Sequence, residues 1–265
     1  MEFAKKKFGQ NFISDKNLIK KIIDILDQEQ NHLIIEIGPG KGALTKELVN
    51  RFKKVIAIEI DYDMEAILKS EINSDKFELI IKDCLEVNFE EIIRTNNFSK
   101  VSLISNTPYY ITSEIIFKTL KISKMLDKAI FMVQKEVAQR ICAKPNENNY
   151  NNLSIAAQLY SNIKYEFTVN KNMFKPVPKV DSAIITFNFN DINLIKVKDD
   201  IKFIAFVRKI FNNKRKTILN NLSNITNNKQ ISLNVLAKLN IKENLRPENI
   251  TLNQFIEIYN EVISC

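Results

Sequence analysis

The chain contains very few of the residues on which many catalytic and metal sites depend. Among its 265 residues there are only three cysteines and one histidine. Because Cys84, Cys142 and Cys265 lie far apart and form no Cys-x-x-Cys pair, the sequence predicts neither a zinc site nor a disulfide framework. Chemistry that needs an imidazole would have to use His32, whose place before an apolar run is more typical of a structural residue.

Long apolar runs are also absent. No run approaches the roughly 18 apolar residues that a membrane span requires, and residues 1–7 lack the apolar segment of a secretory signal. We therefore expect a protein of the reducing cytoplasm that has no membrane partner. Apolar residues make up 45% and charged residues 26% of the chain, which excludes a disordered tail or a coiled-coil rod. The formal net charge of +8 favours an anionic partner, and nucleic acid is the commonest one.

Apolar runs of strand length alternate with helical patterns over the first half of the chain. The sequence predicts strands over residues 32–37, 55–60, 77–83, 101–105 and 129–133, and helices over 15–29, 43–52 and 63–72. Such runs predict a parallel sheet covered on both faces, which right-handed crossovers make doubly wound. Two further strands, near 165–170 and at 182–189, have no long helix between them, so we expect an antiparallel pair at one edge.

The pattern changes after about residue 190 to helices alone. Helical spacing runs from 203 to 222 and across 231–239, and residues 246–248 mark a loop. The sequence therefore predicts two domains: a mostly parallel, doubly wound, Rossmann-like α/β domain over residues 1–190, and a small all-helical domain over residues 191–265.

Four consecutive strands deliver a distinctive set of residues to one edge of the predicted sheet. The first ends in a loop that contains Gly38, Gly40 and Gly42, and the next three end in Glu59, Asp83 and Asn106. Ligands of open parallel sheets bind at this carboxyl edge, and glycines let a backbone approach them closely. A carboxylate at the position of Glu59 can accept both hydroxyls of a ribose, and Asp83 suits an exocyclic amine such as that of adenine.

These features fit either NAD or S-adenosylmethionine. The glycine spacing is G-x-G-x-G instead of the dinucleotide pattern G-x-G-x-x-G, and no Walker-type phosphate loop is present.

The tetrad Asn106-Thr107-Pro108-Tyr109 follows the fourth strand directly. An Asn/Asp-x-Pro-aromatic tetrad is typical of enzymes that methylate planar amino nitrogens. The Asn106 amide and the Thr107 carbonyl can accept the two N–H bonds of an adenine amine, which localises its lone pair. Pro108 fixes the turn and donates no competing N–H, while Tyr109 offers a face on which a base stacks, worth about 1–3 kcal/mol. Because a sulfonium methyl is already activated, positioning supplies most of the catalysis and no metal is needed.

Longer segments extend this interpretation. The chain resembles the KsgA-type small-subunit ribosomal RNA adenine dimethyltransferases in residues 8–13, 36–45, 106–109, 132–138, 174–182, 206–209 and 214–217. The resemblance implies a methyltransferase domain over residues 1–190 and an RNA-binding domain over residues 191–265. It also implies transfer of methyl groups from S-adenosylmethionine to N6 of two adjacent adenosines near the 3′ end of 16S RNA. The partner would be this RNA or a pre-30S particle, with a role in subunit assembly, and we expect a monomer.

The resemblance also assigns roles to single residues. It implies cofactor contacts from Asn11, Ile13, Gly38, Gly40, Glu59, Asp83 and Asn106. Asn11 and Ile13 would close over the cofactor, whereas Tyr109 and Phe174 would sandwich a flipped adenine. The family usually has leucine at the position of Thr107. We expect activity to persist, as it should if that position acts only through its backbone carbonyl.

Basic residues cluster at two places that the resemblance associates with RNA. We expect phosphate contacts, weakening as salt rises, from Lys5, Lys6, Lys7, Arg208, Lys209, Lys214, Arg215 and Lys216. The apolar residues among the later group, such as Phe203 and Phe206, are more typical of a core than of a stacking surface.

Three other functions compete with this interpretation. An Erm-type enzyme would methylate large-subunit RNA, but residues 174–182 and 214–217 favour the small-subunit type. A non-catalytic nucleic-acid-binding assembly or transcription factor could share the fold, although a pure binder does not need the tetrad at 106–109. An NAD-dependent dehydrogenase would require a different glycine spacing and a proton donor.

Overall fold

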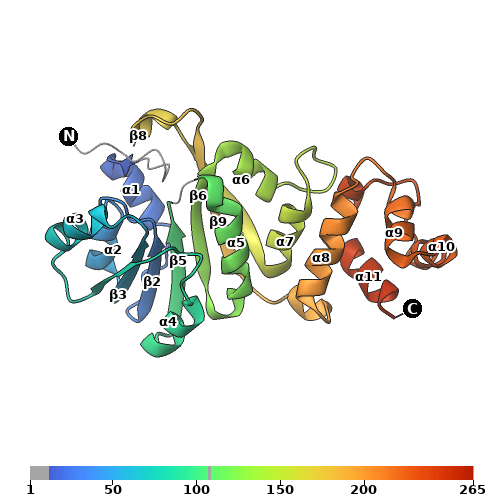
Figure 1. The fold of residues 1–265 in the computed structure, drawn as a ribbon, viewed down its shortest axis with the longest axis horizontal. Coiled ribbons are helices and arrows are strands. Elements are labelled where there is room, and N and C mark those ends of the chain that lie inside the picture. Colours follow the sequence, from blue (N-terminus) through green and yellow to red (C-terminus); the bar gives the residue numbers. More distant parts are fainter. Residues whose placement is uncertain (1–11, 107–108, 265) are drawn as a thin grey trace. The chain divides into compact units, whose positions relative to one another are not determined.

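The computed structural model describes residues 12–106 and 109–264, which form two compact units (Figure 1). The first unit contains the described residues up to Ala138 together with Lys164–Phe189, and the second contains Gln139–Ile163 and the chain from Asn190 onward. The structure divides after Phe189, and the segment 139–163 joins the second unit. The division into a methyltransferase domain over 1–190 and an RNA-binding domain over 191–265 stays a prediction.

A seven-stranded sheet forms the centre of the first unit. Its strands are β2 (His32–Ile37), β3 (Lys54–Glu59), β4 (Phe77–Ile81), β5 (Lys100–Ser105), β6 (Lys128–Gln134), β7 (Ser161–Val169) and β9 (Ser182–Phe189). The spatial order is β4-β3-β2-β5-β6-β9-β7, parallel from β4 to β6, with β9 antiparallel to β6. The predicted α/β fold, mostly parallel with an added edge pair, is confirmed.

The helices of the first unit follow from apolar spacing, and α1 and α4 also begin at a side-chain cap. They are α1 (Lys16–Ile23), α2 (Thr45–Arg51), α3 (Asp63–Glu71), α4 (Phe89–Asn96) and α5 (Thr112–Lys121). Asp15 caps α1 as predicted, since its Oδ1 accepts a hydrogen bond from the Leu18 N–H at 2.8 Å. The helix ends six residues earlier than predicted, because the chain turns at Leu26, whose N–H donates to the Ile23 carbonyl.

The core of this unit lies between the sheet and helices α1, α2 and α3. Leu18, Ile22, Leu48 and Leu68 from these helices share one buried cluster with Ile34 of β2. All six residues of β2 are buried, so both faces of this central strand are covered. Burial on both faces explains why β2 is a continuous apolar run instead of an alternating one.

The chain reverses its direction across the sheet between β2 and β5. From β2 it proceeds outward through β3 to β4, and it then crosses back to β5 and continues to β6 on the other side. The connections that follow β2 and β5 run toward opposite edges of the sheet at this point. Open α/β sheets bind their ligands in the crevice between two such connections. This topology brings the loop after Ile37 next to the segment after Ser105, because these two residues are partners in the β2–β5 register.

A separate two-stranded ribbon lies outside the main sheet. It pairs β1 (Phe12–Ile13) with β8 (Phe174–Lys175) in antiparallel register, so that Ile13 lies opposite Phe174.

The second unit is helical. It contains α7 (Asn152–Tyr160), α8 (Asp200–Phe211), α9 (Ile218–Thr226), α10 (Lys229–Lys238) and α11 (Leu252–Val262), while α6 (Lys135–Ile141) spans the division in the sequence. The predicted continuous helix over 203–222 is wrong, because α8 ends at Phe211 and a turn precedes α9. Thr217 begins α9 by accepting a hydrogen bond from the Asn220 N–H at 3.3 Å. The residues of 139–163 belong here because the Tyr160 hydroxyl donates to Asp200 at 2.6 Å.

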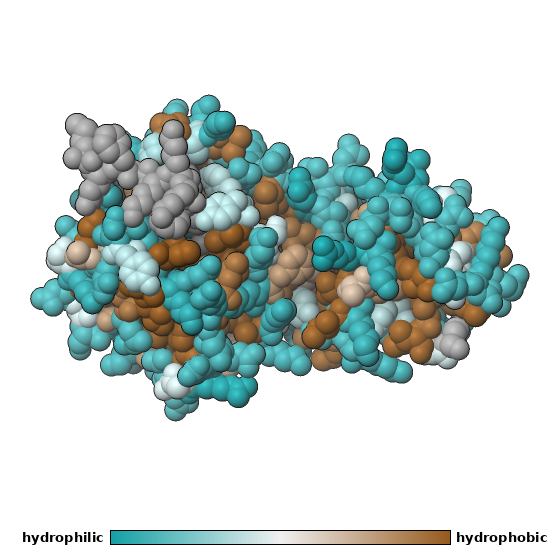
Figure 2. Space-filling view, in the orientation of Figure 1, coloured by the Kyte–Doolittle hydropathy of each residue, from teal (hydrophilic) through white to brown (hydrophobic). Residues whose placement is uncertain are grey.

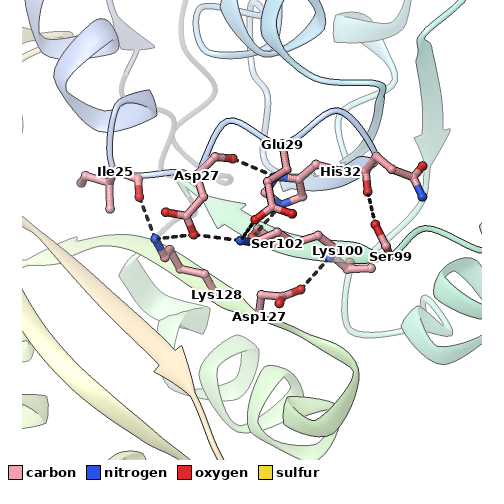
Figure 3. A network of polar contacts seen from close by, with 11 residues as sticks. Ile25, Asp27, Glu29, His32, Ser99, Lys100, Ser102, Asp127 and Lys128 are labelled. Atoms are coloured by element: carbon pink, nitrogen blue, oxygen red, sulfur yellow. Dashed lines mark hydrogen bonds and ion pairs between the residues drawn. The ribbon is translucent and has the colours of Figure 1, made fainter.

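The amino edge of the sheet carries a network of paired charges (Figure 3). Lys100 begins β5 and contacts Asp27 at 3.1 Å and Glu29 at 2.6 Å, while Lys128 begins β6 and contacts Asp27 at 3.3 Å. The fully buried His32 begins β2, and its Nε2 lies 2.9 Å from the Ser102 hydroxyl. Burial lowers the pKa of His32, so the neutral imidazole is favoured in the fold.

The surface shown in Figure 2 is largely hydrophilic, with scattered apolar side chains. Several exposed apolar residues of the first unit follow the carboxyl ends of strands: Ile60, Tyr62, Leu85 and Tyr110. Within the described ranges, no helix is long and apolar enough to cross a membrane.

Candidate active site

The glycine loop after β2 requires glycine for its backbone conformation. Gly38, Gly40 and Gly42 have φ angles of 72°, 56° and 77°, which belong to the left-handed region. A Cβ atom at Gly40 would also approach the Phe12 ring to 3.0 Å. The loop therefore presents bare backbone at the carboxyl edge of the sheet, as the sequence predicts.

Glu59 ties this loop to the end of β3. Its Oε2 accepts a hydrogen bond from the Gly40 N–H at 3.2 Å, and its Oε1 accepts from the N–H groups of Ile60 at 3.0 Å and Asp61 at 2.9 Å. Burial raises the pKa of the Glu59 carboxyl, whereas these backbone donors lower it and oppose the shift. Each carboxylate oxygen has two lone pairs, and Oε1 already accepts two N–H bonds, so Glu59 keeps one lone pair, on Oε2, to accept a ribose hydroxyl.

A second acid, which the sequence analysis did not single out, lies beneath the same loop. Glu36 of β2 is only 1% exposed, and its Oε2 has no hydrogen-bond partner among the described residues. Burial raises the pKa of Glu36 to about 8, the nearby Thr45 hydroxyl opposes this shift, and the charge of Glu59 adds a smaller increase. A charged residue inside the apolar run 32–37 was the signal that could have identified it, since buried acids without a partner are costly and uncommon.

The acid after β4 lies where the sequence predicts it. Asp83 is partly buried and its Oδ1 accepts the Leu85 N–H at 2.8 Å, which closes the turn that follows the strand. This bond is the ordinary structural use of a strand-end acid, and the predicted contact with the cofactor adenine stays a prediction.

The segment after β5 starts directly beside the glycine loop. The Asn106 N–H donates to the carbonyl of Ile37 at 3.2 Å, so the first residue of the tetrad adjoins the residue before Gly38. Thr107 and Pro108 lie outside the described residues. Tyr109 follows in the short helix η2 (Tyr109–Ile111), where it is partly buried, and its hydroxyl lies 2.7 Å from that of Ser182. Nothing in the sequence pattern predicts this last contact.

The residues expected to close over the ligands have a mixed outcome. Asn11 lies outside the described residues. Ile13 and Phe174 face each other in the ribbon, but they are 5% and 1% exposed and belong to the main apolar cluster. Stacking of Phe174 on a base would need the ribbon to open, and both roles stay predictions.

The basic residues of the second unit are all exposed. Arg208 and Lys209 lie in the last turn of α8, while Lys214, Arg215 and Lys216 occupy the turn before α9 instead of a helix. The buried Asn221 shapes this turn, since its amide donates to the carbonyls of residues 213, 216 and 217 at 3.1–3.3 Å. Lys5, Lys6 and Lys7 lie outside the described residues.

Metal ligands do not gather in the described part of the chain. No group of three or more His, Cys, Asp or Glu side chains is placed there to hold a metal ion. Cys84 and Cys142 are free thiols in this part, and burial raises the pKa of Cys84 to about 11.

The chain is similar to known ribosomal RNA methyltransferases. The family model for "Ribosomal RNA adenine dimethylase" matches residues 1–264. "Ribosomal RNA small subunit methyltransferase A" of Mycoplasma mycoides subsp. mycoides is 61% identical over 259 residues, covering 98% of this chain and 97% of that protein. The protein of the same name in Mesoplasma florum is 60% identical over 261 residues, covering 97% of this chain and 98% of that protein.

Two solved structures share the arrangement over nearly the whole chain. A dimethyladenosine transferase from Plasmodium falciparum has a TM-score of 0.80 at 26% identity, covering 95% of this chain and 97% of that one. The 23S rRNA methyltransferase ErmE has a TM-score of 0.73 at 21% identity, covering 96% and 100%. The second likeness concerns the fold alone.

Proposed function

The chain belongs to the ribosomal RNA adenine dimethylase family, and from this premise we propose which of its residues carry the reaction. It is an S-adenosylmethionine-dependent adenine dimethyltransferase that acts on small-subunit ribosomal RNA. We propose that its targets are two adjacent adenosines near the 3′ end of that RNA, each methylated twice at N6. The chain would do this as a monomer, on a pre-30S particle in the cytoplasm, as a step of small-subunit assembly.

The residues at the carboxyl edge fit S-adenosylmethionine by their charge and by the access they allow. The cofactor carries a sulfonium and an ammonium group, and the edge offers two buried acids, Glu59 and Glu36, the latter with an unpartnered oxygen among the described residues. A cation bound nearby would lower the raised pKa of Glu36 and favour its charged form. When bound, S-adenosylmethionine supplies an activated methyl group. In this proposal Gly38 and Gly40 lie against its methionine part, Glu59 holds the ribose, and Asp83 accepts from the adenine amine.

The observation that carries the proposal is the position of Asn106. Its backbone bond to Ile37, where the connections that follow β2 and β5 run apart, holds the first residue of the tetrad beside the glycine loop. An amide oxygen there can accept an N–H of the target amine, and the Thr107 carbonyl can accept the other. With both N–H bonds held, the nitrogen lone pair leaves conjugation with the ring and points toward the methyl group.

Tyr109 completes the place for the base. The target amine is hidden while the adenine is stacked in RNA, so the base must be extruded before it can be methylated. The Tyr109 ring, two residues beyond Thr107, offers a stacking face next to the amine acceptors. Asn11 and Ile13 would close over the cofactor. Phe174 would stack on the face of the base opposite Tyr109, which requires its side chain to leave the apolar cluster.

The exposed basic residues of the second unit would hold the RNA backbone. Arg208, Lys209, Lys214, Arg215 and Lys216 form no ion pair among the described residues, which leaves their charges available to phosphate. Substituting both Arg215 and Lys216 by Gln should weaken RNA binding and reduce the slope of log affinity against log salt by about 2. The matched control is Lys229→Gln with Lys242→Gln, two exposed lysines elsewhere in this unit. Unchanged binding would remove the turn from the RNA interface.

Mapping of the product tests the proposed function as a whole. The protein is incubated with isotope-labelled S-adenosylmethionine and with unmethylated small subunits, free small-subunit RNA or large-subunit RNA. Mass spectrometry of nuclease fragments should locate dimethyladenosine at two adjacent positions near the 3′ end of the small-subunit RNA. Label in large-subunit RNA alone would instead establish the Erm-type alternative, and binding without transfer would establish a non-catalytic factor.

A further inference from the structure

Tyr109 is held at both ends of its side chain. Its backbone belongs to η2, which begins two residues after the tetrad's amine acceptors. Its hydroxyl lies 2.7 Å from the hydroxyl of Ser182, a distance typical of a good O–H···O hydrogen bond. A phenylalanine at this position would be fixed only at its backbone end, so the hydroxyl adds a second point of attachment for the ring.

Ser182 occupies a place from which it can serve the site. It is the first residue of β9 and the register partner of Gln134, the last residue of β6. Because β9 runs antiparallel to β6, its first residue lies at the same edge as the carboxyl ends of the parallel strands. The serine is 0% exposed, and Tyr109 is the hydrogen-bond partner of its hydroxyl among the described residues.

The backbone next to Ser182 is fixed from two directions. The carbonyl of Asp181 accepts the Lys135 N–H at 3.0 Å, and the carboxylate of Asp181 accepts the Lys171 N–H at 3.0 Å. These bonds attach the start of β9 to the start of α6 and to the short helix η4 (Lys171–Met173). The Ser182 hydroxyl is therefore a fixed point to which a less constrained ring can be attached.

We propose that Ser182 is a positioning residue for methyl transfer, whose hydroxyl holds the Tyr109 ring in the orientation on which the target adenine stacks. The inference rests on the proposed function, because it assigns to Tyr109 the role of stacking surface. Burial raises the pKa of Tyr109, so the phenol stays neutral and can donate to Ser182 while the serine hydroxyl stays available as acceptor.

A double-mutant cycle on methyl transfer tests the proposal. Ser182→Ala and Tyr109→Phe each remove one hydroxyl of the pair and keep the aromatic ring. Each should lower kcat by about three- to tenfold, the worth of one hydrogen bond, with KM for S-adenosylmethionine changed by less than about twofold. The double variant should be no slower than the slower single variant, because both remove the same bond. Multiplied losses, or unchanged kcat in Ser182→Ala, would overturn the proposal.

Thr186→Val provides the matched control. Thr186 lies four residues along β9, is 1% exposed, and its hydroxyl has no partner among the described residues. Removal of this buried hydroxyl should leave kcat at the wild-type value. An equal loss in Thr186→Val would mean that the site responds to any change in β9, which contradicts a specific role for Ser182.

A spectroscopic readout separates this proposal from the proposed function. The chain has seven tyrosines, so ¹⁹F NMR after incorporation of 3-fluorotyrosine gives few resonances, and Tyr109→Phe identifies the one from position 109. This resonance should shift in Ser182→Ala and not in Thr186→Val. If wild-type protein transfers no methyl group to small-subunit RNA, the proposed function fails, and the resonance still decides whether Ser182 fixes the ring. An unshifted resonance in Ser182→Ala overturns the inference even in an active enzyme.

Discussion

The two edges of the first unit's sheet use charged side chains in opposite ways. At the amino edge, Lys100 and Lys128 lie against Asp27 and Glu29, so the charges neutralise one another (Figure 3). At the carboxyl edge, Glu36 and Glu59 are buried, and neither forms an ion pair among the described residues. The amino edge therefore stabilises the fold through its own ion pairs, whereas the acids of the carboxyl edge have no cationic partner among the described residues and can accept one from a ligand.

Among the substitutions at the two edges, Asn106→Ala should have the largest effect on methyl transfer. It removes the amide acceptor of the target amine and should lower kcat by about 10²–10³-fold, as loss of one positioned hydrogen-bonding group does in other enzymes. RNA affinity and the free energy of unfolding should change little, because the Asn106 backbone bond to Ile37 remains. Asn234→Ala, an exposed residue of α10, is the control. Parallel losses of transfer and RNA binding would contradict the assigned role.

Glu59→Ala should affect the cofactor more than the target base. The substitution removes the acceptor of the Gly40 N–H and the proposed acceptor of the ribose hydroxyls. KM for S-adenosylmethionine should rise by about 10–100-fold, corresponding to one or two charge-assisted hydrogen bonds. The control is Glu78→Ala on the neighbouring strand β4, an exposed residue paired with Lys54 at 2.9 Å. Steady-state kinetics with an unchanged KM in Glu59→Ala would remove this residue from the cofactor site.

Lys100→Met, at the amino edge, should lower the stability of the fold and leave catalysis unchanged. The Lys100 side chain is 14% exposed and contacts two carboxylates, so its loss leaves two acids close together. The free energy of unfolding should fall by about 1–2 kcal/mol, because the lysine is largely buried but both acids are half exposed and Asp27 keeps Lys128 as a partner, while kcat of the folded enzyme stays unchanged. Lys69→Met removes an exposed pair within α3 and should change stability by less than about 0.5 kcal/mol. Urea unfolding gives both values, and a lost kcat in Lys100→Met would show that the edges are coupled.

The sequence was sufficient for the central sheet and its first helices because these elements have local signals. The apolar run 32–37, the cap at Asp15 and the acids after the strands identify the central sheet and its binding edge before any contact is known. The break between α8 and α9 was not predicted, although residues 212–217 contain no apolar residue and this polar run was a signal for a turn. The bonds from the Asn221 amide to nearby carbonyls define that turn. The membership of 139–163 in the second unit depends instead on partners distant in sequence, such as Asp200.

The residues of the candidate site also fall into those that could be predicted from the sequence and those that could not. The glycine loop, Glu59 and Asn106 follow from strand order, since the end of one strand predicts a place at the edge. The position of Ser182 beside Tyr109 could not be predicted from sequence, because the pairing of β9 with β6 brings it there. The burial of Phe174 opposite Ile13 could not be predicted either, because it depends on the pairing of the separate ribbon. The only sequence signal for Glu36 was that it is a single acidic residue within an apolar strand.

The smallest expected effect concerns pH and Glu36. The folded pKa of about 8 lies above the ordinary value of 4.5, so the fold retains a proton that the unfolded chain has lost. Stability from this group is complete below pH 4.5 and is lost as pH rises toward 8. The free energy of unfolding of the cofactor-free protein should fall by about 1 kcal/mol between pH 7 and 8, and that of Glu36→Gln should fall by less. Urea unfolding at several pH values, with Glu78→Gln as control, checks this. Identical slopes in wild type and Glu36→Gln would show that Glu36 is ionised in the fold.

A crystal structure of the protein with S-adenosylmethionine bound would test whether the carboxyl edge of the sheet brings the cofactor and Asn106 together. We expect the cofactor between the connections that follow β2 and β5, with its ribose hydroxyls on Glu59 and its methyl group facing the Asn106 side chain. A cofactor bound at another edge, or an Asn106 side chain remote from the methyl group, would contradict this expectation.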